Sequence, residues 1–115
     1  MASVEFGGVD GVRDARVLEG ALERPLATFA GEQLYGSPFA RAAALMHSIV
    51  EGRPFVGANR AVALLAAAFW LEREGYRFEA DQPDALQATL GVAAGERELD
   101  DTARWLREHA VRLDR

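Results

Sequence analysis

The sequence feature that most constrains the fold is a short loop followed at once by a long apolar run. The loop reads Arg-Pro-Phe-Val-Gly-Ala-Asn-Arg over residues 53–60, and the apolar run extends from Ala61 to Leu71. Such a run is too short to cross a bilayer, and it is apolar on all sides of a helix, which is typical of a helix packed among others. We therefore expect a central buried helix over about 58–74, with the loop at its start.

Four further helices are predicted from capping residues and apolar stripes. Their expected bounds are about 15–24, 38–52, 83–95 and 100–113. Asp14, Ser37 and Asp100 are the predicted N-caps, and Pro38 follows Ser37 at the first helical position, where proline is favoured.

The apolar stripes of the last two helices predict which residues face the core. In the helix over 83–95 we expect Leu86, Leu90 and Ala93 to point inward. In the last helix the apolar stripe continues as far as Leu113, so we expect the helix itself to reach that residue.

Three stretches lack helical spacing and are expected to be extended. Residues 28–36 have Gly31-Glu32 flanked by apolar and aromatic residues, which predicts a small β-hairpin. We call residues 28–35 the flap. Tyr76 and Phe78 alternate with polar residues and predict a short strand, and Val4 and Phe6 give a weaker strand or arm signal. Residues 1–115 are thus predicted to form one all-α domain, a helical bundle with a small β-hairpin flap.

The composition excludes several kinds of site. The chain has no cysteine, which removes disulfides, thiolate metal ligands and a cysteine nucleophile. All 13 basic residues are arginine, so phosphate binding would fall to arginine. With two histidines, no metal site is expected. The formal net charge of −5 disfavours nucleic acid as a direct partner. The start of the chain has no signal-peptide pattern, so a cytoplasmic location is expected and no membrane association.

The loop over 53–60 allows two interpretations from its residues alone. A helix N-terminus presents free N–H groups and a partial positive charge, and small residues such as Gly57 and Ala58 let an anion approach. Asn59, Arg53 and Arg60 could add donors, which predicts a phosphate or carboxylate site. The alternative is a tight turn between helices, with Asn59 capping the helix and both arginines solvated.

Candidates for acid–base chemistry are few. His47 falls beside an apolar helical stripe and has Glu51 four residues later, a spacing typical of an ordinary surface pair. His109 is expected to be exposed on the last helix. Both histidines are interpreted as structural, and Trp70 and Trp105 as core or partly buried anchors.

Several blocks in the same order resemble the death-on-curing (Doc) toxins of the Fic/Doc superfamily. Residues 7–14 and 18–25 look like the opening of that family, and residues 28–35 look like its flap. Residues 53–60 stand where the family has His-Pro-Phe-x-Asp-Gly-Asn-Lys-Arg. The helix that usually precedes the Gly7-Gly8 segment in the family has no counterpart, which we expect to leave an apolar surface for a partner.

The resemblance implies a nucleotide-dependent transferase. In the family the motif's histidine is the general base, its acidic residue holds Mg²⁺, and its Gly-Asn turn, helix start and final arginine hold phosphates. Doc toxins phosphorylate elongation factor Tu, Fic relatives transfer AMP, and the antitoxin Phd neutralises Doc with a C-terminal segment. ATP, Mg²⁺, a Phd-like antitoxin and elongation factor Tu are therefore the cofactors and partners that the resemblance implies.

Three departures remove the parts of the motif that do chemistry. Arg53 replaces the family's histidine, and a guanidinium stays protonated, so it cannot accept a proton. Gly57 replaces the acidic residue and offers Mg²⁺ no carboxylate. Ala61 replaces the final arginine. Loss of the base alone would be expected to cost about 10²–10⁴-fold in rate.

Other parts of the motif are kept. Pro54, Phe55 and Asn59 match the family, Ala58 is a mild change, and Arg60 can stand in for the family's lysine. We therefore expect a Doc-like toxin of a toxin–antitoxin system with a degenerate transferase site, which retains weak anion or nucleotide-phosphate binding. The expected anion site is Arg53, Gly57, Ala58, Asn59 and Arg60. The expected partner-binding flap is Thr28, Phe29, Gly31, Glu32, Leu34 and Tyr35.

Two alternatives stay open. One is an active transferase that uses non-standard residues, with His47 or Glu51 as a relocated base and no conventional Mg²⁺ site. The other is a non-catalytic regulatory protein that binds no nucleotide and is completed by a partner or by a second copy of the chain.

Overall fold

The computed structural model describes residues 11–113. The helices are α2 (Ala15–Glu23), α3 (Pro38–Gly52), α4 (Asn59–Arg73), α5 (Gln82–Ala93) and α6 (Leu99–Glu108), with a 3₁₀ helix, η1 (Arg24–Leu26), directly after α2. The strands are β1 (Thr28–Phe29), β2 (Glu32–Gln33), β3 (Tyr76–Phe78) and β4 (Ala110–Arg112). The all-α architecture with a small hairpin is confirmed. The arm expected at Val4 and Phe6 lies outside the described residues.

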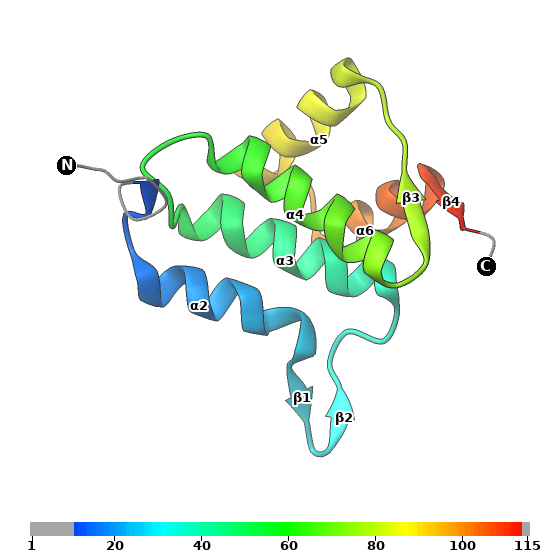
Figure 1. Cartoon of the computed structure of the whole chain (residues 1–115), viewed down its shortest axis with the longest axis horizontal. Helices are drawn as coiled ribbons and strands as arrows, with labels where there is room; N and C mark the ends of the chain where they lie inside the picture. The colour runs from blue at the N-terminus through cyan, green and yellow to red at the C-terminus, as the bar shows by residue number, and fades with distance from the viewer. Residues whose placement is uncertain (1–10, 114–115) are drawn as a thin grey trace.

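Helix α3 forms the centre of the molecule. It packs against α2, α4, α5 and α6, and Figure 1 shows it lying between α2 and α4. Eight of its residues are buried, and five of them, Ala42, Ala43, Ala44, Met46 and Ile49, are 0–1% exposed. The run of alanines explains the position of α3, because small side chains let neighbouring helices approach on several sides.

The prediction that the helix over 58–74 is the central one is wrong, although its bounds are nearly correct. Helix α4 buries Ala63, Ala67 and Leu71, which follow one another at steps of four. On its other side Leu65 and Phe69 are 69% and 64% exposed. The apolar run of α4 therefore covers the core on one face and leaves an apolar surface on the other.

Capping residues set the helix starts. Asp14 accepts hydrogen bonds from the N–H groups of Arg16 and Val17, and Ser37 accepts one from Ala40, as predicted. The predicted cap Asp100 is wrong by two residues. The N-cap is Glu98, which forms a reciprocal capping box with Asp101, and helix α6 therefore begins at Leu99.

The C-terminal end of the chain also differs from the prediction. Helix α6 ends at Glu108 rather than near Leu113, and β4 pairs antiparallel with β3. Tyr76 lies opposite Arg112, and Phe78 lies opposite Ala110. The strand predicted at Tyr76 and Phe78 is confirmed. Its backbone N–H and carbonyl groups need hydrogen-bond partners, and residues 110–112 supply them by leaving the helix and pairing as a strand.

Helix α5 packs through a different face from the one predicted. Leu86 and Leu90 are 55% and 43% exposed, and Ala93 is exposed too. The buried residues are Ala85, Ala88, Thr89 and Val92. These four residues also recur at steps of three and four, as one face of a helix requires. Their side chains are smaller than those of Leu86 and Leu90, so α5 can pack closely on α3 and α4.

The flap is a two-stranded hairpin, as predicted, and it projects away from the helices in Figure 1. Thr28 pairs with Gln33, and Phe29 pairs with Glu32. Ala30 and Gly31 have φ values of 53° and 83°, which a tight two-residue turn between antiparallel strands requires.

Across residues 11–113, the helices are all too short or too polar to cross a bilayer.

Candidate functional site

The loop between α3 and α4 is held in a sharp turn. Arg53 closes α3 in the left-handed conformation, with φ 51° and ψ 56°, and Ala58 precedes α4 with φ 59° and ψ 27°. Left-handed backbone is costly for residues other than glycine, so the surrounding contacts must hold these two positions.

Asn59 supplies one of these contacts. Its Oδ1 accepts a hydrogen bond from the Phe55 N–H at 3.0 Å, and its Nδ2 donates to the Phe55 carbonyl at 3.0 Å. The side chain thus closes the loop on itself. It does not cap the helix, as the structural interpretation of the loop had it, because Asn59 is the first residue of α4 and Ala58 is the N-cap. This use of the amide leaves Arg53, Arg60 and the backbone as the main donors that the loop can offer to an anion.

A cavity of about 790 Å³ opens beside the loop. All five residues of the expected anion site line it, and so does Glu51. The remaining lining residues are mostly apolar and come from the loop and from α3, α4 and α5: Val50, Val56, Ala61, Leu64, Ala85, Leu86, Thr89 and Ala93. The exposed position of Leu86 is explained in part by this cavity, because its side chain forms part of the wall.

The start of α4 has no side-chain capping, unlike the starts of α2, α3 and α5. Ala58 at its N-cap has no side chain that can accept a hydrogen bond. The free N–H groups of a first helical turn carry a partial positive charge. Arg53 and Arg60 line the same cavity, so this end of the cavity has residues that can supply further donors.

Residues that could bind a metal ion are few near these donors. No cluster of three or more His, Cys, Asp or Glu side chains occurs in the part of the chain that the structure describes. Gly57 has no carboxylate, and a Cβ built on it meets no atom within 4 Å. Its φ is not in the left-handed region, so neither space nor backbone conformation requires glycine at this position. Gly57 therefore offers a Mg²⁺ ion no ligand, and Glu51 is the one carboxylate among the described residues that line the cavity.

His47 does not belong to the cavity. Its ring is 5% exposed, and its Nε2 lies 2.8 Å from the hydroxyl of Thr102 on α6. Burial lowers the pKa of His47, although Glu51, whose Oε2 lies 3.7 Å from Nδ1, acts in the opposite direction. His47 therefore joins α3 to α6 inside the core, and Glu51 is the member of the pair that reaches the cavity.

His109 is less exposed than predicted. It follows α6 as the C-cap, its Nδ1 lies 2.9 Å from the Trp105 carbonyl, and its ring lies against the Trp105 ring. Trp105 is 9% exposed and Trp70 is half-buried, so both tryptophans are the anchors that the sequence predicted.

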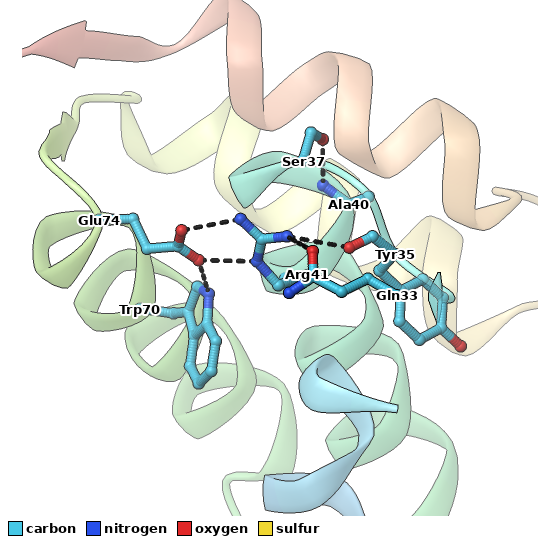
Figure 2. A network of polar contacts seen from close by, with 7 residues as sticks. All are labelled: Gln33, Tyr35, Ser37, Ala40, Arg41, Trp70 and Glu74. Atoms are coloured by element: carbon cyan, nitrogen blue, oxygen red, sulfur yellow. Dashed lines mark hydrogen bonds and ion pairs between the residues drawn. The ribbon is translucent and has the colours of Figure 1, made fainter. Parts of the chain in front are cut away.

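A polar network anchors the flap to the start of α3. Figure 2 shows Arg41 between Glu74 on one side and the flap on the other. Its guanidinium donates to both carboxylate oxygens of Glu74 and to Gln33 Oε1 and the Tyr35 carbonyl. Trp70 donates its indole N–H to the same carboxylate. The bond from Arg41 lowers the pKa of Glu74, which keeps the carboxylate charged.

A second arginine holds the flap from the other side. Arg24 donates to the Tyr35 hydroxyl at 2.9 Å and to Ser48 Oγ at 2.9 Å. Sequence reasoning did not find either network, because Arg41 and Glu74 lie 33 residues apart and no local spacing relates them. Beyond this anchored base the flap is open to solvent, and Phe29 and Leu34 are 75% and 57% exposed.

The flap and the loop do not share one cavity. None of the flap residues lines the cavity beside the loop. Arg41 and Arg53 lie twelve residues apart on α3 and its cap, which is about 18 Å along a helix axis. The two predicted functional regions therefore lie toward opposite ends of α3.

An apolar groove of about 620 Å³ lies beside the flap. Its walls come from α2 and η1 on one side and from α4 on the other, and α3 contributes to the lining as well. Leu22, Leu26 and Phe69 line it and are 51%, 61% and 64% exposed. Contiguous exposed apolar surface of this kind is typical of an interaction site.

The fold and site define a class of protein: a small helical domain whose central helix leads through a tight loop to an uncapped helix start, with a hairpin anchored at the other end. The sequence profile of the Fic/DOC family matches residues 2–71, and the chain belongs to this family. It is 37% identical over 79 residues to "Toxin Doc" of Mycolicibacterium smegmatis (strain ATCC 700084 / mc(2)155). The aligned part is 69% of this chain and 61% of that relative, so the chain spans somewhat less than two thirds of the curated toxin it matches.

Proposed function

We propose that the protein is a Doc-type member of a toxin–antitoxin system whose transferase site is degenerate and which acts by binding. Its loop cavity would hold a phosphate-like anion, such as the phosphates of a nucleotide, weakly and without Mg²⁺. The observation that carries the proposal is the lining of this cavity, where Arg53 and Arg60 stand beside an uncapped helix start and an apolar wall.

The same lining argues against transfer by the family's usual mechanism. Arg53 occupies the position of the family's base and cannot accept a proton, because its guanidinium stays charged at any physiological pH. Gly57 supplies no carboxylate for a metal ion. Two guanidinium groups can offset the charge of a phosphate group without a metal, but neither can remove a proton from a hydroxyl.

The alternative of an active transferase depends on Glu51. Of the two relocated bases considered, His47 is bonded to Thr102 in the core and does not line the cavity. Glu51 does line it, and its side chain is 60% exposed. This alternative is the less favoured one, because only one of its two candidate bases reaches the cavity.

A protein partner is part of the proposal. The groove beside the flap exposes Leu22, Leu26 and Phe69, and this surface supports the binding of an antitoxin or another protein. Elongation factor Tu, as a target, and a second copy of the chain are further partners that the family resemblance and the apolar surface leave open.

Titration calorimetry with ATP, with and without Mg²⁺, tests the anion site. We expect weak binding that Mg²⁺ does not improve, and loss of that binding in the Arg53→Ala/Arg60→Ala double variant. Arg77→Ala, which removes one exposed arginine outside the cavity, is the control. No binding at millimolar ATP would refute the proposal and favour a non-catalytic protein that binds no nucleotide.

Incubation with labelled ATP and elongation factor Tu tests transfer. We expect no label above background from the natural sequence. The comparison is Arg53→His/Gly57→Asp, which returns a base and a carboxylate. At Gly57 an added Cβ meets no atom within 4 Å and φ is not in the left-handed region. Label transfer by the natural chain that Glu51→Gln abolishes would establish the alternative instead.

A further inference from the structure

The segment before α2 is fastened to the loop that shapes the cavity. The Arg13 N–H donates to the Pro54 carbonyl at 2.6 Å, and the Asp14 N–H donates to the same oxygen at 3.1 Å. In the other direction the Val56 N–H donates to the Gly11 carbonyl at 2.8 Å. Val12 and Phe55 form an isolated antiparallel bridge. Residues 11–14 thus run beside the loop and are bonded to it through the backbone, and we call them the strap.

The side chain of Arg13 strengthens this attachment. Its Nε donates to the Arg53 carbonyl at 2.8 Å, and its Nη2 donates to the Gly52 carbonyl at 2.9 Å. These are carbonyls at the C-terminal end of α3, which have no partners within the helix and carry a partial negative charge. One guanidinium therefore satisfies two carbonyls at the point where the chain turns into the loop.

Arginine is the residue type that this position needs. Its planar group presents several N–H donors in a fixed arrangement, so Nε and Nη2 can reach two neighbouring carbonyls together. A lysine ammonium is a single compact group and cannot reproduce this fork. The contact also holds Arg53 in its left-handed conformation, because the carbonyl of Arg53 itself is bonded.

We propose that Arg13 is a positioning residue for the loop cavity. Arg13 does not line the cavity, so it makes no direct contact with a ligand there. It acts through the loop: by bonding the carbonyls of Gly52 and Arg53, it sets the direction in which the Arg53 side chain leaves the backbone. This inference rests on the proposed anion-binding function of the cavity, and it assigns to the strap a role that the loop motif does not contain.

The test compares Arg13→Gln and Arg13→Lys with a matched control. Arg16→Gln is that control, because Arg16 is an exposed arginine three residues along the same chain segment and does not line the cavity. It removes the same charge without removing a bond to the loop, so it corrects for the general effect of charge on anion binding. ATP and inorganic pyrophosphate are the probes, both without Mg²⁺, at a temperature where circular dichroism shows every variant to be folded.

Both Arg13 variants are expected to weaken the binding of the two probes about tenfold, while Arg16→Gln stays within about twofold of the natural sequence. Amide hydrogen exchange should show faster exchange of the Val56 N–H in the Arg13 variants only. A purely stabilising role for Arg13 would lower the melting temperature and leave the affinity of the folded protein unchanged.

Three results would overturn the inference. The first is an unchanged affinity in Arg13→Gln while the natural sequence binds the probes, which leaves the proposed function intact. The second is an unchanged exchange rate at Val56, because the loop then does not depend on Arg13. The third is the absence of any binding by the natural sequence, which refutes the proposed function itself and leaves Arg13 with no site to position.

Discussion

Arg41 and Glu74 form a two-pronged ion pair, with Nε to Oε2 at 2.9 Å and Nη2 to Oε1 at 2.8 Å. The side chains are 13% and 26% exposed, so water screens the pair only in part. The pair joins the first turn of α3 to the C-cap of α4, and Arg41 extends it to the flap through Tyr35. One contact therefore supports both the packing of two helices and the base of the flap.

Glu74→Gln is expected to lower the free energy of unfolding by about 1–3 kcal/mol, because charge-assisted hydrogen bonds are stronger than neutral ones and Arg41 would lose its partner. Urea denaturation at neutral pH measures this loss. Glu79→Gln is the control, since the Arg77–Glu79 pair has a similar distance of 2.8 Å but side chains 59% and 55% exposed. Glu79→Gln should lower the free energy of unfolding by less than about 0.5 kcal/mol. Equal losses in the two variants would contradict the structural role given to Glu74.

The Glu74 carboxylate also predicts a pH dependence. The hydrogen bond from Arg41 lowers its pKa in the folded state, so the folded chain binds a proton there less readily than the unfolded chain. The stabilisation is therefore complete above the ordinary pKa of a glutamate, and it is lost as the pH falls through the lower pKa of the folded state. The natural sequence should lose more stability on acidification below about pH 4.5 than Glu74→Gln does. Parallel curves for the two proteins would refute this.

His47 gives a second pH dependence at higher pH. Burial lowers its pKa below the ordinary value of 6.5, and Arg24 adds to this, while Glu51 and Glu98 oppose it. The folded state therefore favours the neutral ring, which pairs with the hydroxyl of Thr102. Stability is complete above about pH 6.5 and falls as the pH drops below that value, because the unfolded chain takes up the proton first.

Replacing His47 by glutamine should remove this part of the pH dependence. Chemical denaturation at pH 8 and at pH 5 should show a smaller difference in unfolding free energy for His47→Gln than for the natural sequence. Thr102→Val provides an independent check, because it leaves a buried ring nitrogen without a partner. It should cost about 1–3 kcal/mol at pH 8. If His47→Gln keeps the full difference between the two pH values, another group causes it.

Ala58 is expected to be a strained residue whose replacement by glycine stabilises the chain. Its φ of 59° lies in the left-handed region, which glycine adopts without steric cost. Ala58→Gly should therefore raise the free energy of unfolding by about 0.5–1 kcal/mol, after allowance for the greater freedom of glycine in the unfolded chain. Gly95→Ala is the matched reversal, because Gly95 has a φ of 75° after α5, and it should destabilise. A loss of stability in Ala58→Gly would show that the surrounding contacts relieve the strain.

Local signals in the sequence predicted the elements better than their packing. The caps Asp14 and Ser37 and the turn at Gly31 depend on neighbouring residues, and each was confirmed. The central position of α3 could not be predicted in this way. The apolar run of α4 is the longer uninterrupted one. Only the tertiary fold decides that Leu65 and Phe69 face outward.

The same limit applies to the candidate site. The resemblance to Doc toxins located the loop, and the expected anion-site residues do gather on one cavity. Asn59 holds the loop from nearby, but further contacts come from Arg13, about forty residues earlier, and no spacing rule relates Arg13 to the loop. The strand at residues 110–112 was missed for a similar reason, because its partner β3 lies more than thirty residues away.

Gly52, at the end of α3, lies close against Val17 of α2, and this contact leads to a prediction that involves both residues. A Cβ placed on Gly52 would lie 2.6 Å from Cγ1 of Val17, closer than any real contact allows. Valine is branched at Cβ and cannot easily turn this group away. Gly52→Ala should therefore push α2 from α3 and cost about 1–3 kcal/mol.

A double variant separates this clash from other effects of the substitution. Val17→Ala removes the opposing group, so Gly52→Ala should cost much less in that background, and the two single losses should sum to more than the loss of the double variant. Gly20→Ala is the control for adding a methyl group to a helix, because Gly20 lies within α2 with nothing within 4 Å of its added Cβ. It should stabilise by about 0.5–1 kcal/mol through helix propensity. Additive losses for Val17 and Gly52 would mean that the cost of Gly52→Ala does not arise from contact with α2, and the loss would then be attributed to the carbonyl that Arg13 binds at the same residue.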